Sequence, residues 1–168
     1  IETFSYLPGM GFGVAAATLV GQSLGAKKKD EAHKIGLMSY FLATVFMILI
    51  GVIFYIFAPI FARLFSEDKE VIDLVVKVLR IIALFQPFLC MTLVITSILQ
   101  GAGDTKFPMY STLIGIWGVR VLGVYVLGIK LNMGLVGVWI AYALDLTVRG
   151  VILMIRFING KWKEIIID

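Results

Sequence analysis

Three charged residues lie deep inside apolar stretches of this sequence: Arg120, Asp145 and Arg149. A charge in the apolar interior of a membrane is costly, so such residues either pair with one another or bind an ion. At about 1.5 Å per helical residue, Arg120 and Asp145 fall at the same depth of two antiparallel helices, roughly 20 Å and 18 Å from the inner ends. Arg149 follows Asp145 by four residues, which places both on one helix face.

Two kinds of chemistry fit this cluster. Asp145 can hold a proton or a sodium ion, or it can pair with Arg120, with Arg149 as a second partner. We favour the ion pair, because a cation site needs surplus negative charge and these three residues carry surplus positive charge. The sequence therefore predicts an intramembrane charge network at Arg120, Asp145 and Arg149 whose role is structural.

A second polar interruption, Gln86-Pro87, lies in an apolar stretch that also contains Thr92. Proline removes a backbone hydrogen bond, and an amide side chain is costly in lipid unless it faces protein or a water-filled space. We interpret Gln86, Pro87 and Thr92 as candidate cavity-lining residues. The alternative is that Gln86 makes a purely structural polar contact.

Enzyme chemistry and metal binding find no support in the sequence. An active site needs a clustered nucleophile, base or set of metal ligands. The single histidine, His33, and the single cysteine, Cys90, belong to different predicted helices, and no acid is placed beside either. We expect a solvated His33 and a Cys90 that serves as a small packing residue. The sequence thus predicts no catalytic residue, no metal site and no cofactor.

The composition indicates which elements position these residues. Hydrophobic residues make up 60% of the chain and charged residues 15%, whereas soluble domains carry about 25% charged residues. We expect an all-α membrane protein, a bundle of five transmembrane helices at about 4–24, 31–57, 67–99, 106–128 and 133–158. The net charge of +4 requires no nucleic-acid partner, because cytoplasmic loops of membrane proteins are normally rich in Lys and Arg.

The distribution of cations predicts the orientation. Four lysines lie within Lys27–Lys34, which marks this loop as cytoplasmic. Alternation of the spans then places Lys106, Arg156, Lys161 and Lys163 on the same side, which gives eight cations inside. Five cations fall outside: Arg63, Lys69, Lys77, Arg80 and Lys130. We expect a multi-pass protein of the cell (plasma) membrane with a cytoplasmic C-terminus.

The stretch Gln100–Met109, Gln-Gly-Ala-Gly-Asp-Thr-Lys-Phe-Pro-Met, separates two long apolar segments. Gly101 and Gly103 permit a positive φ, so the preceding helix can stop sharply. Asp104 or Thr105 can cap the next helix, and proline suits a first helical turn. The sequence therefore predicts a tight hairpin whose motif residues are Gln100, Gly101, Gly103, Asp104 and Pro108.

Three stretches in this order resemble the multidrug and toxic compound extrusion (MATE) family: Gly21-Gln22-Ser23-Leu24-Gly25-Ala26 with Glu31-Ala32, then Gln100–Met109, then Trp139-x-Ala141-x-x-Leu144-Asp145-x-x-x-Arg149-Gly150. The resemblance covers nearly the whole chain. It implies a fold of twelve transmembrane helices in two lobes, which flank a central cavity and rock to alternate access. The chain is similar to helices eight to twelve, so we expect most of the C-terminal lobe, with the upstream lobe absent.

The resemblance implies a secondary active antiporter that exports amphiphilic, often cationic drugs or metabolites, coupled to sodium or proton entry. One alternative is a lipid-linked or polysaccharide flippase of the same superfamily, which a wide basic cavity would favour. A second alternative is a membrane scaffold without transport activity. The expected partners are membrane lipid, a small-molecule substrate, and a coupling Na⁺ or H⁺ bound mostly by the missing lobe.

The coupling ion stays open at this point. Some sodium-coupled members of the family carry an acid midway along the tenth helix, and the matching stretch Ile81–Leu99 has none. Besides Asp145, the sequence offers Glu2 at the outer edge of the first span, where its depth is undetermined.

Overall fold

The computed structural model describes residues 2–165, except the side chains of Glu2 and Phe4, and every regular element in this range is helical. The role of the Glu2 side chain therefore lies outside the described residues. The elements are α1 (Glu2–Gly25), α2 (Lys29–Arg63), α3 (Lys69–Leu84), α4 (Gln86–Gly101), α5 (Lys106–Leu113), the π-helical segments η1 (Ile114–Val121) and η2 (Val124–Lys130), α6 (Gly134–Ile158) and the 3₁₀ turn η3 (Lys161–Glu164).

The described residues contain the membrane spans that the composition predicts. Four helices are long and apolar enough to cross a membrane: Ser5–Gly25, Lys29–Arg63, Lys106–Lys130 and Gly134–Ile158. The pair α3 and α4 passes the same test together and is bent by 53°, so it makes a fifth span when counted as one. The chain is thus an all-α, multi-pass membrane protein, as expected.

Two helix boundaries differ from the prediction. Helix α2 continues past residue 57 and through Pro59 to Arg63, because Ala58 and Ala62 still have buried faces to pack. The third predicted helix, 67–99, is broken at Phe85 into α3 and α4. Pro87 lies in the first turn of α4, where a missing backbone N–H breaks no helical bond.

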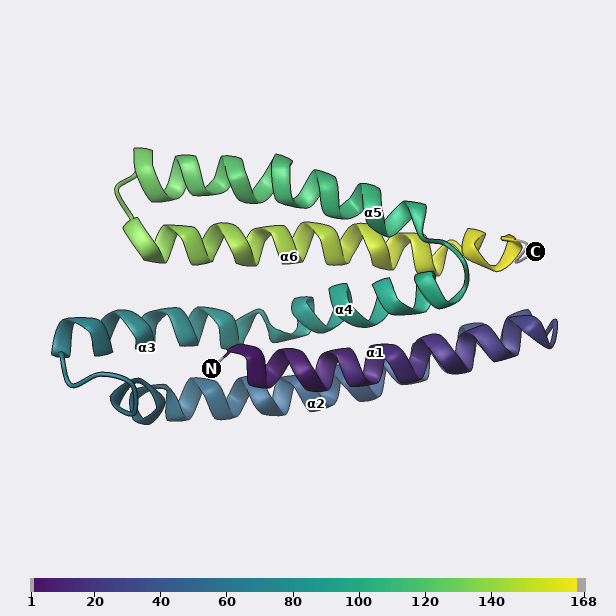
Figure 1. Cartoon of the computed structure of the whole chain (residues 1–168), viewed down its shortest axis with the longest axis horizontal. Helices are drawn as coiled ribbons and strands as arrows, with labels where there is room; N and C mark the ends of the chain where they lie inside the picture. The colour runs from purple at the N-terminus through teal and green to yellow at the C-terminus, as the bar shows by residue number, and fades with distance from the viewer. Residues whose placement is uncertain (1, 166–168) are drawn as a thin grey trace.

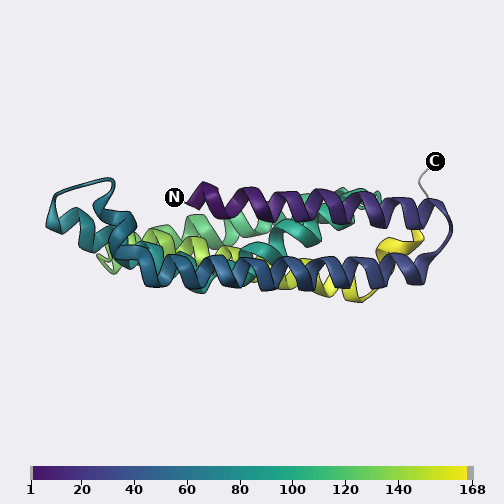
Figure 2. The same cartoon turned by 90° about the horizontal axis from the view of Figure 1, so that it is seen from below.

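Helix α4 lies at the centre of the bundle. It contacts α1, α2 and α6, and Val94, Ile95 and Ile98 on it are fully buried. Figure 1 shows α6 beside the helix formed by α5, η1 and η2, with α4 between α6 and α1. Figure 2 shows α2 running beneath this arrangement along most of its length. The remaining surface of α2 is apolar and exposed, for example at Phe41, Leu49 and Ile56, which suits contact with lipid.

The lysine-rich segments gather at one end of the bundle. The turn between α1 and α2, the hairpin between α4 and α5, and the C-terminal segment lie together at one end in Figure 1. The link between α2 and α3 and the turn before α6 lie at the opposite end. This arrangement follows from the alternation of the spans, and the assignment of the lysine-rich end to the cytoplasm remains a prediction.

Candidate functional site

The three charged residues predicted from depth come together between η1 and α6. Arg120 donates from Nε and Nη2 to Oδ2 of Asp145, over 3.0 and 2.6 Å. Arg149 donates from Nη2 to the same oxygen over 3.2 Å. The Asp145 side chain is fully buried, while 32% of the Arg120 side chain is exposed. One carboxylate oxygen therefore joins the helix Lys106–Lys130 to α6.

A glycine makes this approach of the two helices feasible. Gly115 is buried on η1, and a methyl group there would collide with Oδ1 of Asp145 and crowd the Arg149 side chain. Farther along the pair, a methyl group at Gly137 would lie 2.7 Å from the backbone of Leu127. Small residues allow helix backbones to approach closely in a membrane, where packing replaces the hydrophobic effect.

The cluster carries a net charge of +1, because two guanidinium groups share one carboxylate. Oδ1 of Asp145 and Nε of Arg149 are buried and have no partner among the described residues. The guanidinium carbon of Arg120 lies 4.5 Å from the centre of the Tyr142 ring, a cation–π distance. The carboxylate of Asp145 is thus occupied by its two arginines.

The hairpin motif forms a second ion pair at the end of the bundle. Asp104 is buried; Oδ2 accepts from Nε of Arg156 over 2.8 Å, and Oδ1 accepts from the Phe107 backbone N–H over 3.4 Å. The Asp104 side chain therefore ties the end of α6 to the first turn of α5. Arg156 also lies over the Phe107 ring, 4.9 Å from its centre.

The two glycines of the hairpin differ in their roles. Gly103 has the predicted positive φ, 86°. Gly101 is the last residue of α4, without a positive φ, and a methyl group there would lie 2.6 Å from the Ala17 carbonyl oxygen. The turn interpretation of Gly101 is therefore corrected: this glycine allows α4 to contact α1.

The cavity-lining interpretation of Gln86 and Thr92 is wrong in this structure, because both side chains are buried within the bundle. Gln86 donates to the Ser5 hydroxyl on α1 over 3.1 Å, and its Oε1 has no partner among the described residues. Thr92 donates to the carbonyl oxygens of Phe88 and, on α6, of Leu146. Pro87 alone of the three lines an open space, an apolar groove with Tyr55 and Leu84.

Comparison with known proteins decides the family. Residues 1–126 match the family model described as MatE. The chain belongs to the MatE family. A protein of Thermotoga maritima named "Probable multidrug resistance protein NorM" is 31% identical over 164 residues, which cover 98% of this chain and 35% of that protein. The mouse "Multidrug and toxin extrusion protein 2" is 26% identical over 98% of this chain and 29% of that protein.

Solved transporter structures have the same fold over this region. The crystal structure of the eukaryotic MATE transporter AtDTX14 superposes with a TM-score of 0.91 at 24% identity, over 97% of this chain and 36% of that one. A transporter of Pyrococcus furiosus superposes with a TM-score of 0.85 at 20% identity, over 95% and 36%. The MatE chain thus spans about a third of the length of the relatives that it matches. These relatives are named as transporters or resistance proteins rather than as enzymes.

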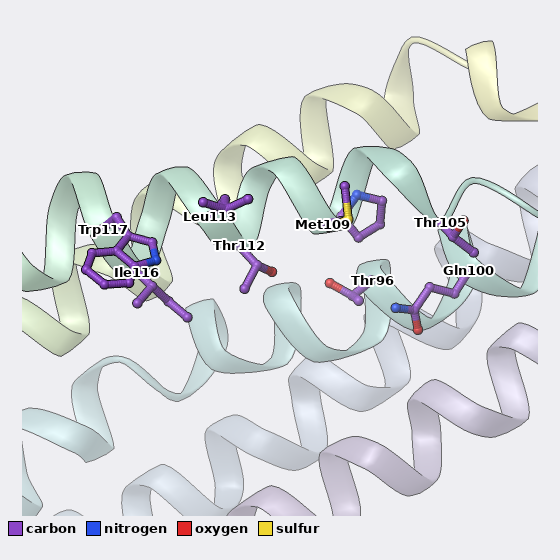
Figure 3. Close-up of a pocket in the computed structure, with 9 residues that line it drawn as sticks. Thr96, Gln100, Thr105, Met109, Thr112, Leu113, Ile116 and Trp117 are labelled. Atoms are coloured by element: carbon purple, nitrogen blue, oxygen red, sulfur yellow. The ribbon is translucent and has the colours of Figure 1, made fainter.

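An open groove in this MatE chain was not predicted from the sequence. It lies between α4 and the helix that begins with α5, has a volume of about 350 Å³, and is lined by residues that include Thr96, Gln100, Met109, Thr112 and Trp117. Figure 3 shows Thr112 and Thr96 projecting from the two helices into the space between them. The only sequence signal for this groove is the presence of polar residues on both sides of the hairpin. Their spacing does not show where the side chains point.

The tail of the MatE chain packs near His33, which was expected to be solvated. His33 stacks on Phe157, with ring centres 4.9 Å apart, and Phe157 stacks on Trp162 at 5.3 Å. Trp162 is fully buried and donates from Nε1 to the Phe157 carbonyl oxygen over 2.7 Å. His33 is therefore half-buried rather than solvated as expected, because the η3 turn folds back and places Trp162 near its ring. No group of three or more His, Cys, Asp or Glu side chains in the described part of the chain could hold a metal ion.

Proposed function

We propose that this chain forms most of the C-terminal lobe of a secondary active antiporter in the cell (plasma) membrane, with a cytoplasmic C-terminus. The full protein would export amphiphilic, often cationic, drugs or metabolites by alternating access, coupled to sodium or proton entry. Membership of the MatE family supports this proposal, as do the names of its relatives, which describe multidrug resistance and extrusion.

The arrangement around Asp145 bears on which part of the transporter binds the coupling ion. Asp145 is a fully buried acid, and both neighbouring arginines donate to it. A carboxylate held in this way cannot easily accept and release a coupling ion. We therefore assign the coupling Na⁺ or H⁺ mostly to the part of the transporter that this chain does not cover. The lobe supplies one wall of the cavity and moves as one body.

A full-length transporter reconstituted in liposomes tests the activity. Export of the fluorescent cation ethidium should depend on an imposed sodium or proton gradient, and it should stop when an ionophore collapses that gradient. Export that continues without either gradient, or no export of organic cations by a folded protein, would refute the antiporter.

Asp145→Asn in the same protein tests whether the coupling ion binds outside this chain. We expect less folded transporter, while the protein that does fold keeps its dependence on the coupling ion. Asp73→Asn is the matched control, because Asp73 is an exposed acid on α3. A well-folded Asp145→Asn transporter that binds substrate but has lost gradient-driven export would make Asp145 a coupling residue.

A flippase for lipid-linked or polysaccharide substrates is the second candidate, and one observation favours it. Arg120 lines an open groove of about 310 Å³ together with Val124, Val138, Trp139 and Tyr142. A partly exposed guanidinium beside aromatic rings suits a phosphate-bearing amphiphile. Transbilayer movement of a fluorescent lipid diphosphate in the same liposomes, without export of ethidium, would favour this function over drug export.

A further inference from the structure

The apolar groove that contains Pro87 lies between α2 and the break that joins α3 to α4, where the two helices meet at a bend of 53°. It has a volume of about 520 Å³, and its walls include the exposed side chains of Ile48, Val52 and Ile56 on α2 and of Leu84 on α3. Among the described residues, no charged side chain lines it. Its surface therefore suits a hydrocarbon chain.

The groove falls within a single leaflet of the membrane. Lys34 is the last charged residue before the apolar part of α2. At 1.5 Å per residue, Tyr55 lies about 30 Å from Ile35, which is the thickness of the hydrocarbon core. Tyr55 thus marks the boundary with the lipid headgroups, where tyrosine is enriched. From Tyr55 to Ile48 the groove extends about 10 Å inward, which is less than half of that core.

Arg80 lies at the headgroup end of the groove. Its guanidinium carbon is 5.3 Å from the centre of the Tyr55 ring, a cation–π distance. Leu84, which lines the groove, follows Arg80 by one turn on the same face of α3. A guanidinium held by a ring in this way keeps its N–H groups free to donate to another ligand. Arg80 is thus placed where lipid phosphates lie.

The charge of Arg80 is not neutralised within the described part of the chain. The arginines of the two ion-paired sites are each bonded to an aspartate, whereas Arg80 forms no salt bridge with any described residue. Lys77, an exposed cation, precedes Arg80 by one turn, and the nearest acid of α3, Asp73, is a further turn away. This end of the groove is therefore complementary to an anion.

We propose that this groove binds one phospholipid with an anionic headgroup. Arg80 donates to the phosphodiester oxygens, for which a guanidinium has the matching fork geometry, and Lys77 adds a second positive charge. One acyl chain lies in the groove along Val52 and Leu84. The site is at the end of the bundle opposite the lysine-rich segments, so the lipid belongs to the outer leaflet in the proposed orientation. It is recruited from the surrounding membrane, independently of the proposed export function.

Photochemical cross-linking tests the acyl-chain part of the site. The full-length transporter is reconstituted in nanodiscs of phosphatidylcholine that contain phosphatidylglycerol with a diazirine in one acyl chain, at a fraction below saturation. On illumination, we expect cross-links to residues 48–56 and 83–87, and far fewer in Val52→Trp, whose indole ring fills the groove. Val45→Trp is the matched control, because Val45 is an exposed residue two turns away on the same face of α2 and outside the groove.

Arg80→Gln tests recognition of the headgroup. Cross-linking of the groove should fall about tenfold, the lower end of the value of a hydrogen bond to a charged group. Arg63→Gln is the matched control, because it removes the same charge at the same end of the bundle but outside the groove. The same diazirine on phosphatidylcholine should cross-link more weakly than on phosphatidylglycerol, because the choline cation cancels the phosphate charge. Arg80 and Val52 are both exposed, so neither substitution should prevent folding.

Three results would overturn the proposal. Absence of cross-links to the groove in the parent protein would mean that another part of the transporter, or another protein, covers it. Equal cross-linking in Val52→Trp and Val45→Trp would mean that no acyl chain lies in the groove. Equal cross-linking by the two headgroups, or in Arg80→Gln and Arg63→Gln, would mean that the groove contacts bulk lipid without selecting an anionic one.

Discussion

Gly115→Ala is the substitution that examines the charge cluster most directly. The added methyl group would collide with Oδ1 of Asp145 and lie 3.2 Å from Cδ of Arg149. The helices must then separate, or the carboxylate must turn away from its arginines. Gly118→Ala is the matched control on the same π-helical segment, because the nearest atom to its methyl group is Cγ2 of Ile114 at 3.9 Å.

The two variants should differ in stability by a measurable amount. Replacing glycine by alanine within a helix stabilises it by about 1 kcal/mol, and this gain applies to both positions. At Gly115, overpacking costs about 1–3 kcal/mol. Where Asp145 loses its partners, leaving a buried charge unpaired costs about 3–5 kcal/mol. We therefore expect Gly115→Ala to be about 1–5 kcal/mol less stable than Gly118→Ala.

Thermal unfolding of the purified full-length transporter in detergent measures this difference. Gly115→Ala should melt below the parent protein, and Gly118→Ala should melt at or above it. A combined Gly115→Ala and Asp145→Ala variant should lose less stability than the two single variants lose together, because both substitutions act on one contact. Equal melting temperatures for Gly115→Ala and Gly118→Ala would refute the packing of this glycine against the carboxylate.

Three further predictions concern the ends of the bundle. Asp104→Ala should destabilise the transporter by about 1.5–3 kcal/mol, the value of hydrogen bonds to charged groups. If the losses of stability from Asp104→Ala and Arg156→Ala add fully in the double variant, the two residues do not interact. Trp162→Phe keeps the stacked ring and removes the hydrogen bond to the Phe157 carbonyl, so unfolding should show a loss of about 1 kcal/mol, and an unchanged melting curve would contradict this. A cysteine replacing Lys28 in a Cys90→Ala background should react with an impermeant maleimide only from the cytoplasmic side. Labelling in intact cells would show that the predicted orientation is wrong.

Much of the site could be predicted because depth in a membrane is a linear function of position along a helix. The rise per residue gives the level of Arg120 and of Asp145 from the ends of their spans, and the structure joins them through one oxygen. Helical periodicity added Arg149 on the same face. The hairpin likewise follows from local rules, although only the structure shows that Asp104 pairs with Arg156.

The sequence by itself determined that this chain is a helical membrane protein, where its spans lie and which charges share a level. These properties depend on the transfer of each segment from water to lipid, which is a local quantity. Only the tertiary structure decided the direction of each side chain around its helix. Gln86 bonds to Ser5 inside the bundle, Trp162 covers the rings of Phe157 and His33, and Thr96 meets Thr112 across an open groove. The contacts of Gln86 with Ser5 and of Trp162 with His33 join segments that are distant in sequence, so neighbouring helices rather than local composition select the buried face.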